Sequence, residues 1–219
     1  MIIPRNFAES LFPWLGQKII FIHTPKCGGS FINSSFRKRF KRCPTMRWPE
    51  ARGHKTYIEY KDIFEKRNKD ICAYTLFSVV RNPWSWHVSW FFYIKSGKSG
   101  HPIEHQLFKD MAFSDYIAWL GDTLAMRGPD PYFMKQVSDW LIDENGKIAV
   151  SHILRQESLA EDFSKFIKNF GLAIHPGKKK INSSKHEDYR SYYGDKEIEI
   201  IGKRHARDIQ LFGYSFDKP

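Results

Sequence analysis

A lysine and two glycines follow an apolar run near the start of the chain. Ile19-Ile20-Phe21-Ile22 has the composition of a buried strand, and the turn Lys26-Cys27-Gly28-Gly29-Ser30 leads from it into a helix-like segment. A strand that feeds a glycine turn at a helix start directs several backbone N–H groups and the positive end of the helix dipole at one point. Lys26 adds a full positive charge beside it. The pattern therefore predicts an anion-binding cradle.

The order of residues separates this cradle from two others. In nucleotide triphosphatases the lysine follows the last glycine and precedes a hydroxyl that holds magnesium, whereas Lys26 precedes both glycines. A phosphatase loop would use Cys27 as a thiolate at the helix start, but it would need an arginine six residues later, where this chain has Asn33. A plain turn with a capping serine remains the alternative for a glycine pair alone.

A second candidate anion site follows another apolar, β-branched run. Residues 73–80 are predicted to form a buried strand, and Asn82-Pro83 supplies the N-cap and first residue of a helix. Arg81 thus stands at the carboxyl end of the strand, where ligands bind in open α/β sheets, and we expect it to share a crevice with Lys26. Ser89 lies about two turns into the helix. A guanidinium and a hydroxyl together suit a phosphate dianion.

Together the two motifs resemble those of the sulfotransferases that use 3′-phosphoadenosine 5′-phosphosulfate (PAPS). In that family the first loop holds the 5′-phosphosulfate, and an arginine and a serine of the second motif hold the 3′-phosphate. The resemblance implies that Arg81 and Ser89 bind the 3′-phosphate, that adenosine 3′,5′-bisphosphate (PAP) is the product, and that no metal is required. It also implies that the phosphosulfate is held by Pro25, Lys26, Cys27, Gly28, Gly29, Ser30 and Phe31.

Later segments resemble the carbohydrate-sulfating branch of that family. Residues 153–163 are similar to its strand-to-helix passage and residues 208–214 to its C-terminal end, whereas residues 101–147 match poorly. The resemblance implies a hydroxyl acceptor on a carbohydrate or glycoconjugate. It also implies further donor contacts from Ser184, Lys185, Tyr189 and Arg190.

Two positions depart from the family pattern. Cys27 stands where threonine is usual, and Trp86 stands where many members have a second basic residue. Trp84, Trp86 and Trp90 could stack on adenine or sugar rings, although aromatic residues at helical spacing more often belong to the core. These departures affect the detailed contacts to phosphate. They leave the two positive charges, those of Lys26 and Arg81, in place.

Sulfuryl transfer needs a base for the acceptor hydroxyl and cations that stabilise the charge growing on the bridging phosphate oxygen. Lys26 suits the second task. We expect His54 to be the base, because histidine titrates near neutrality and this one lies in a glycine-containing loop between the donor motifs. Similar enzymes that sulfate polysaccharides have a base histidine in this segment. His23 and Glu59 remain alternatives.

The composition suits a single basic domain. With 219 residues, 42% of them hydrophobic, the chain can bury one sizeable core. We expect residues 1–219 to form one α/β domain with a P-loop-like central parallel sheet flanked by helices on both faces, because strands alternate with helices. The net charge of +11 favours acidic partners, but it does not favour one class of acidic partner over another. Lys178-Lys179-Lys180 is either a solvated loop or a contact to donor phosphate or an anionic acceptor.

Hydrophobic periodicity and capping residues predict where the elements begin and end. Strands are expected at residues 18–22, 73–80 and 148–154. A loop is expected at 97–102, and Gly213 is expected to end the last helix. Helices are expected at 30–39, 56–67, 83–95, from 114 onward, and at 131–141, 159–170 and 195–212.

The cysteines and the first residues bear on the compartment. Cys27, Cys43 and Cys72 form no even set and no metal-type pair, which is typical of a reducing compartment. No apolar run reaches the roughly 18 residues of a membrane span, and the first 17 residues lack a signal-peptide core. Glycans at the sequons of Asn33 and Asn182 would obstruct the site. We expect a cytoplasmic, bacterial-type protein, unless the sequence was trimmed of a membrane anchor.

Two other functions stay open. A nucleotide kinase would need magnesium and an acidic residue at the end of a buried strand, where this chain has Arg81. A non-catalytic basic module that binds anionic polysaccharide or nucleic acid would need a basic surface but no nucleotide pocket. No nucleic-acid motif is visible in the sequence, and we expect no nucleic-acid partner. The oligomeric state is not indicated.

Overall fold

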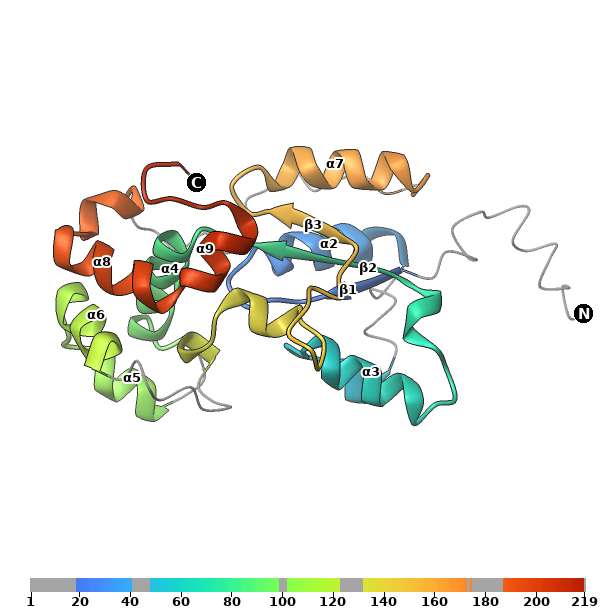
Figure 1. The fold of residues 1–219 in the computed structure, drawn as a ribbon, viewed down its shortest axis with the longest axis horizontal. Coiled ribbons are helices and arrows are strands. Elements are labelled where there is room, and N and C mark those ends of the chain that lie inside the picture. The colour runs from blue at the N-terminus through green and yellow to red at the C-terminus, as the bar shows by residue number, and fades with distance from the viewer. Residues whose placement is uncertain are drawn as a thin grey trace, which may run out of the picture. The chain divides into compact units, whose positions relative to one another are not determined.

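The computed structural model describes residues 19–40, 48–98, 102–122, 132–172, 174 and 187–218. The chain divides into two compact units (Figure 1). The first unit comprises Met1–Thr24, Gly28–Val80 and Trp140–Ile181, and the second comprises Pro25–Cys27, Arg81–Asp139 and Asn182–Pro219. The expectation of one domain over residues 1–219 stays a prediction.

Within the described residues, the first unit contains a parallel sheet of three strands in the order β1-β2-β3. The strands are β1 (Ile19–Ile22), β2 (Thr75–Val80) and β3 (His152–Arg155). Ile20 lies opposite Leu76, and Ser78 lies opposite Ile153. Since all three strands run in the same direction, their carboxyl ends meet at one edge, where the chain continues toward the predicted site residues.

Three helices flank this sheet, which confirms the predicted α/β class with a central parallel sheet. They are α2 (Gly29–Phe40), α3 (Tyr57–Glu65) and α7 (Leu159–Asn169). The short 3₁₀ turn η3 (Pro49–Ala51) precedes α3, and the turn η4 (Ile71–Ala73) lies between α3 and β2. The ring centroid of Phe77 in β2 lies 4.5 Å from that of Phe166 in α7 and 6.3 Å from that of Phe36 in α2. Figure 1 shows α3 and α7 on opposite sides of the strands.

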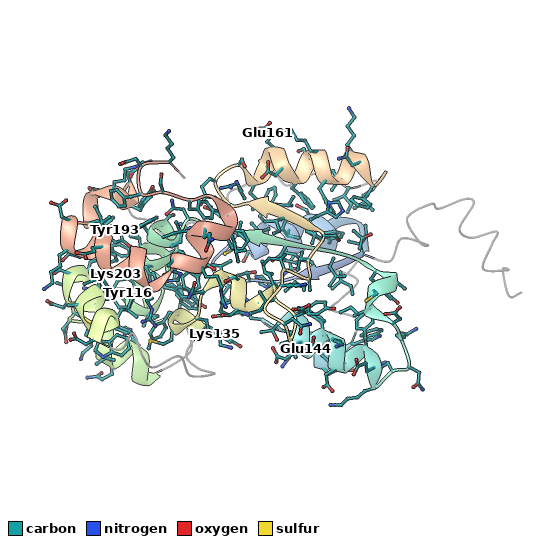
Figure 2. The ribbon with its side chains drawn as sticks, viewed as in Figure 1. Tyr116, Lys135, Glu144, Glu161, Tyr193 and Lys203 are labelled. Carbon is teal, nitrogen blue, oxygen red and sulfur yellow. The ribbon has the colours of Figure 1, made fainter. Side chains whose placement is uncertain are left out.

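The described part of the second unit is helical. Asn82 caps α4 by accepting from the Trp84 and Ser85 N–H groups, and Pro83 is its first residue, as predicted. Tyr116 (Figure 2) is fully buried, and its hydroxyl lies 2.8 Å from Nδ1 of His87. The helices are α4 (Pro83–Lys95), α5 (Pro102–Phe108), α6 (Phe113–Asp122), α8 (Asp195–Arg204) and α9 (Ala206–Phe212), with the 3₁₀ turns η5 (Tyr132–Met134), η6 (Val137–Trp140) and η7 (Tyr189–Tyr192).

The prediction of one helix over residues 131–141 is wrong. Only the short turns η5 and η6 form in its described part. The carboxylate of Asp208 accepts from the N–H groups of Val137 and Ser138 at 2.7 and 2.9 Å, and Asp139 accepts from the N–H of Gln136 at 2.7 Å. Side-chain acceptors thus bind amides that a continuous helix would use.

The predicted helix over residues 195–212 is interrupted at His205, which separates α8 from α9. The ring of His205 is fully buried and lies 2.7 Å from Nε2 of His87 and 3.3 Å from a carboxylate oxygen of Asp208. The bond to His87 is tertiary, and with the local bond to Asp208 it outweighs helix propensity here. Gly213 ends α9 in the left-handed conformation, as predicted. The third strand is shorter than predicted, and α5 was not predicted.

Candidate active site

The backbone of the cradle has two left-handed residues. Lys26 has a φ of 60° and Gly28 has a φ of 79°. Left-handed residues two positions apart are typical of turns that direct successive N–H groups toward one side, where an anion binds. Helix α2 starts directly after this turn, at Gly29, and its dipole favours negative charge at that end.

Both glycines are required by close packing within the first unit. An added Cβ at Gly29 would lie 1.8 Å from Nε2 of His23, and one at Gly28 would lie 2.4 Å from a methyl carbon of Leu159. Leu159 belongs to the segment that resembled the family's strand-to-helix passage, so that segment helps to shape the turn. The N–H groups of Gly28 and Gly29 donate to no acceptor in the described part of the chain. These two amides are thus available to an anion.

Phe31 differs from the two glycines. Its N–H donates to the carbonyl of Gly28 at 2.9 Å, within the first turn of α2. Its ring lies 5.9 Å from that of Phe163, centroid to centroid. The Phe31 amide is therefore engaged in the helix, and we leave it out of the candidate anion donors.

In the second unit, Arg81 lies against the loop that carries Lys26. One guanidinium nitrogen, Nη1, donates to the carbonyl of Lys26 at 3.0 Å. Nε and Nη2 donate to the hydroxyl of Ser85 at 2.9 and 2.8 Å. Arg81 is only 9% exposed. The sequence predicted that Arg81 lies near Lys26, but not that Ser85 orients Arg81. The spacing of four residues between Arg81 and Ser85, in the first turn of α4, was a signal for this contact.

Lys26 has an unusual electrostatic environment. Burial, and after it the charge of Arg81, lowers the pKa of Lys26 to about 8. Its ammonium lies 3.7 Å from the ring centroid of Tyr93, and the ion pairs among the described residues do not include it. Two cations held close together raise the free-energy cost of charging Lys26, and a bound anion would reduce that cost.

His54 is held in one tautomer within the first unit. Its Nδ1 lies 2.8 Å from the carbonyl oxygen of His23. A carbonyl only accepts, so Nδ1 carries the hydrogen, and the lone pair of the neutral ring is on Nε2. Gly53, at a φ of 91°, turns the chain just before His54. Trp140 donates its indole N–H to the His54 carbonyl at 3.3 Å.

The two alternative bases have other tasks. Desolvation, and after it the neighbouring His54, lowers the pKa of His23 to about 3, so its ring accepts protons poorly near neutrality. Its Nε2 also packs against Gly29. Glu59 forms a capping box with Thr56 at the start of α3 and pairs with Lys55 at 3.0 Å. Of the three candidates, His54 has the chemistry best suited to a base.

The remaining predicted residues are placed as follows. Ser89 is buried in α4, one turn after Ser85. Tyr189 donates its hydroxyl to the carbonyl of Phe216. Arg190 pairs with Asp188 at 3.1 Å and donates to the carbonyl of Asp217 at 2.9 Å, so both residues have structural partners. Residues 175–186, with Ser184, Lys185 and the lysine run, lie outside the described residues.

A model of the sulfotransferase family matches residues 16–215, which is most of the chain and includes every candidate residue above. The chain belongs to the sulfotransferase family. It is accordingly a PAPS-dependent sulfotransferase, an enzyme of sulfuryl transfer to a hydroxyl acceptor. No curated protein and no solved structure gives a match.

The described residues of this sulfotransferase fit an anionic donor. In the first unit the amides of Gly28 and Gly29 are groups of the kind that bind an anion. In the second unit the ammonium of Lys26 and the guanidinium of Arg81 are cations of the kind that bind phosphate. When bound, the donor supplies the activated sulfuryl group. No cluster of three metal-binding side chains occurs among the described residues, and none of their helices is long and apolar enough to cross a membrane.

Proposed function

We propose that this sulfotransferase transfers the sulfuryl group of PAPS to a carbohydrate hydroxyl, with His54 as the general base. Nε2 of His54 takes the proton of the acceptor hydroxyl while the acceptor oxygen forms its bond to sulfur. The ammonium of Lys26 stabilises the charge left on the phosphate oxygen as the old sulfur–oxygen bond breaks, and PAP leaves. No metal takes part.

The observation that carries this proposal is the 2.8 Å contact between Nδ1 of His54 and the carbonyl of His23. It fixes the tautomer with the lone pair on Nε2, and the same carbonyl stabilises the imidazolium after proton transfer. Lys26 follows His23 by three positions, so the chain itself limits the distance between their Cα atoms to about 11 Å. The carbonyl that orients the base thus belongs to the same short segment as the candidate cation.

Donor binding is assigned to two sets of groups. The backbone from Pro25 to Ser30, with the ammonium of Lys26, holds the 5′-phosphosulfate. Arg81 and Ser89 hold the 3′-phosphate, and Ser85 orients Arg81. The engaged side chains of Tyr189 and Arg190 support a structural role for them, so their part in donor binding, like that of Ser184 and Lys185, depends on the family resemblance alone.

The carbohydrate acceptor depends on the resemblance of the C-terminal segments to the carbohydrate-sulfating branch. A cytoplasmic location depends on the cysteine usage and on the two sequons. Both remain predictions. Acceptor profiling with labelled PAPS tests the first directly, because transfer to a sugar hydroxyl supports it and transfer confined to phenols or steroid hydroxyls contradicts it.

Thermal-shift measurements separate this function from the two alternatives. We expect PAP to raise the melting temperature in the presence of a chelator, since no metal is needed. A shift with ATP and magnesium but not with PAP would indicate a kinase. A shift with heparin alone would indicate a non-catalytic basic module.

A further inference from the structure

Lys26 has a backbone conformation that its side chain disfavours. Among the described residues other than glycine, only Lys26 and Asn68 have a positive φ. Asparagine tolerates the left-handed region, whereas in lysine the Cβ lies too close to the following carbonyl oxygen there. Such a conformation persists only where neighbouring groups hold it, and it is most frequent at functional sites.

The peptide groups on both sides of Lys26 accept a hydrogen bond from a buried side chain of the same unit. The carbonyl of Lys26 accepts from Arg81 at 3.0 Å, and the carbonyl of Pro25 accepts from the indole N–H of Trp86 at 2.8 Å. The two bonds fix the planes of the peptides before and after Lys26. Together they determine its φ and ψ, and therefore the direction in which its side chain leaves the backbone.

The ring of Trp86 is itself firmly placed. Its side chain is fully buried in the first turns of α4, and its centroid lies 5.9 Å from that of Trp90 and 5.7 Å from that of His205. Asn82 and Pro83 fix where this helix begins. A buried ring is unsuited to stacking on adenine, which supports the core interpretation of this tryptophan. Its N–H nevertheless donates to the loop that carries Lys26.

We propose that Trp86 is a positioning residue for Lys26, acting through its hydrogen bond to the carbonyl of Pro25. This inference rests on the proposed role of Lys26 in sulfuryl transfer. Without the bond, the peptide between Pro25 and Lys26 can rotate, Lys26 can relax to a negative φ, and its ammonium moves away from the position where the leaving phosphate oxygen develops charge. Misplacement of about 1 Å in an active site can lower the rate by up to 10²-fold.

Replacing Trp86 by phenylalanine keeps an aromatic ring and removes the N–H. We expect Trp86→Phe to lower kcat roughly 10-fold or more, with little change in KM for the acceptor. Trp84→Phe is a matched control, because the Trp84 indole also belongs to α4 and donates to a backbone carbonyl, that of Ile198, at 3.1 Å. The control should lose comparable stability and keep its kcat within about twofold.

A double-mutant cycle with Lys26→Ala tests whether Trp86 acts through Lys26. Lys26→Ala alone should lower kcat by roughly 10²-fold, the usual loss for an electrostatic contact in the transition state. In that background, Trp86→Phe should cost less than about twofold more. Trp86→His, which restores a ring N–H, should have a higher kcat than Trp86→Phe. Trp86→Met, which also lacks the ring N–H, replaces Trp86→Phe in the cycle if the latter does not fold.

The outcomes separate this inference from the proposed function. Equal kcat values for the Trp86 and Trp84 variants, additive losses in the cycle, or no gain from Trp86→His would overturn the role of Trp86 and leave that of Lys26 intact. Full turnover of Lys26→Ala would overturn both. A large, non-additive loss for Trp86→Phe with an unaffected Trp84→Phe supports the inference.

Discussion

The glycine side and the lysine side of the cradle are held by different forces. On the glycine side, in the first unit, shape determines the backbone, because His23 and Leu159 occupy the space that a Cβ would need at Gly29 and Gly28. Such a restraint depends on the absence of side chains. Any added atom must displace a packed neighbour.

On the lysine side, in the second unit, hydrogen bonds determine the backbone. Trp86 and Arg81 each donate to one carbonyl next to Lys26, and Ser85 holds Arg81. These restraints can be removed singly. We therefore expect substitutions on the glycine side to act mainly on folding, and substitutions on the lysine side to act in graded steps on donor binding and turnover.

The largest expected effect is that of replacing His54, which the carbonyl of His23 orients in the first unit. His54→Ala should slow transfer by roughly 10²–10⁴-fold and leave PAP affinity nearly unchanged, because a positioned base contributes that much to the rate and does not contact the donor. Initial rates with labelled PAPS, and calorimetry with PAP, measure the two effects.

The control for this variant is His105→Ala, since Nδ1 of His105 also lies near a backbone carbonyl, that of Ile94, at 3.1 Å. It should keep its activity. Full activity of His54→Ala across the pH range, with transfer abolished by His23→Ala or Glu59→Gln at preserved donor affinity, would move the base elsewhere.

The second prediction concerns the charge on the lysine side. Because the pKa of Lys26 is lowered to about 8, the free enzyme loses this positive charge as the pH rises through that value. In the pH profile, kcat/KM for PAPS should therefore be highest below pH 8. Above pH 8 it should decrease along a descending limb, by up to about tenfold per pH unit. Rate profiles with PAPS varied at saturating acceptor measure the limb.

Two variants sharpen the assignment of the limb. It should disappear in Lys26→Ala, and it should move to higher pH in Arg81→Ala, because removing the neighbouring positive charge raises the pKa of Lys26. An unchanged descending limb in Lys26→Ala would show that another group titrates there.

The third prediction tests shape on the glycine side. Gly29→Ala should lower the free energy of unfolding by about 1–3 kcal/mol, because the His23 ring must move to admit the methyl group. Urea denaturation measures this loss. Adding His23→Ala should recover part of it. Gly202→Ala, where the nearest atom to a new Cβ would lie 3.7 Å away, should be neutral or stabilising. A Gly29→Ala protein as stable as the wild type would contradict the comparison.

The smallest expected effect is on the residue that orients Arg81. Ser85→Ala should weaken PAP binding by roughly 3- to 10-fold, because it removes the acceptor of two guanidinium hydrogen bonds without removing the guanidinium. Ser85→Thr keeps the hydroxyl and should retain most of the affinity. If calorimetry gives the same loss for the threonine and alanine variants, the hydroxyl is not what orients Arg81.

Local signals were sufficient for the first two strands and for most helix starts. The apolar runs at residues 19–22 and 75–80 and the Asn82-Pro83 cap predicted the elements that carry Lys26 and Arg81. The break at His205 could not be predicted, since it depends on a buried bond to His87, which is 118 residues away in the sequence. The same holds for the turns near residue 137, whose amides bind a carboxylate 71 residues away.

The site shows the same limit. Residue types predicted that Lys26, Arg81 and His54 could do chemistry, but not what holds them. The bond from Trp86 to the carbonyl of Pro25 spans 61 residues, and that from His54 to the carbonyl of His23 spans 31. Side chains that bind backbone carbonyls leave no pattern of spacing in a single sequence.

The central claim is that the paired motifs bind a donor with a 3′-phosphate, and calorimetry of Arg81→Ala tests it most directly. PAP should bind the wild-type protein without metal. The variant should bind PAP roughly 10- to 100-fold more weakly, the equivalent of about 1.5–3 kcal/mol for a charge-assisted contact, while its affinity for adenosine 5′-monophosphate, which lacks the 3′-phosphate, changes less than about twofold. Equal losses for the two nucleotides would contradict the account, because Arg81 would then not recognise the 3′-phosphate.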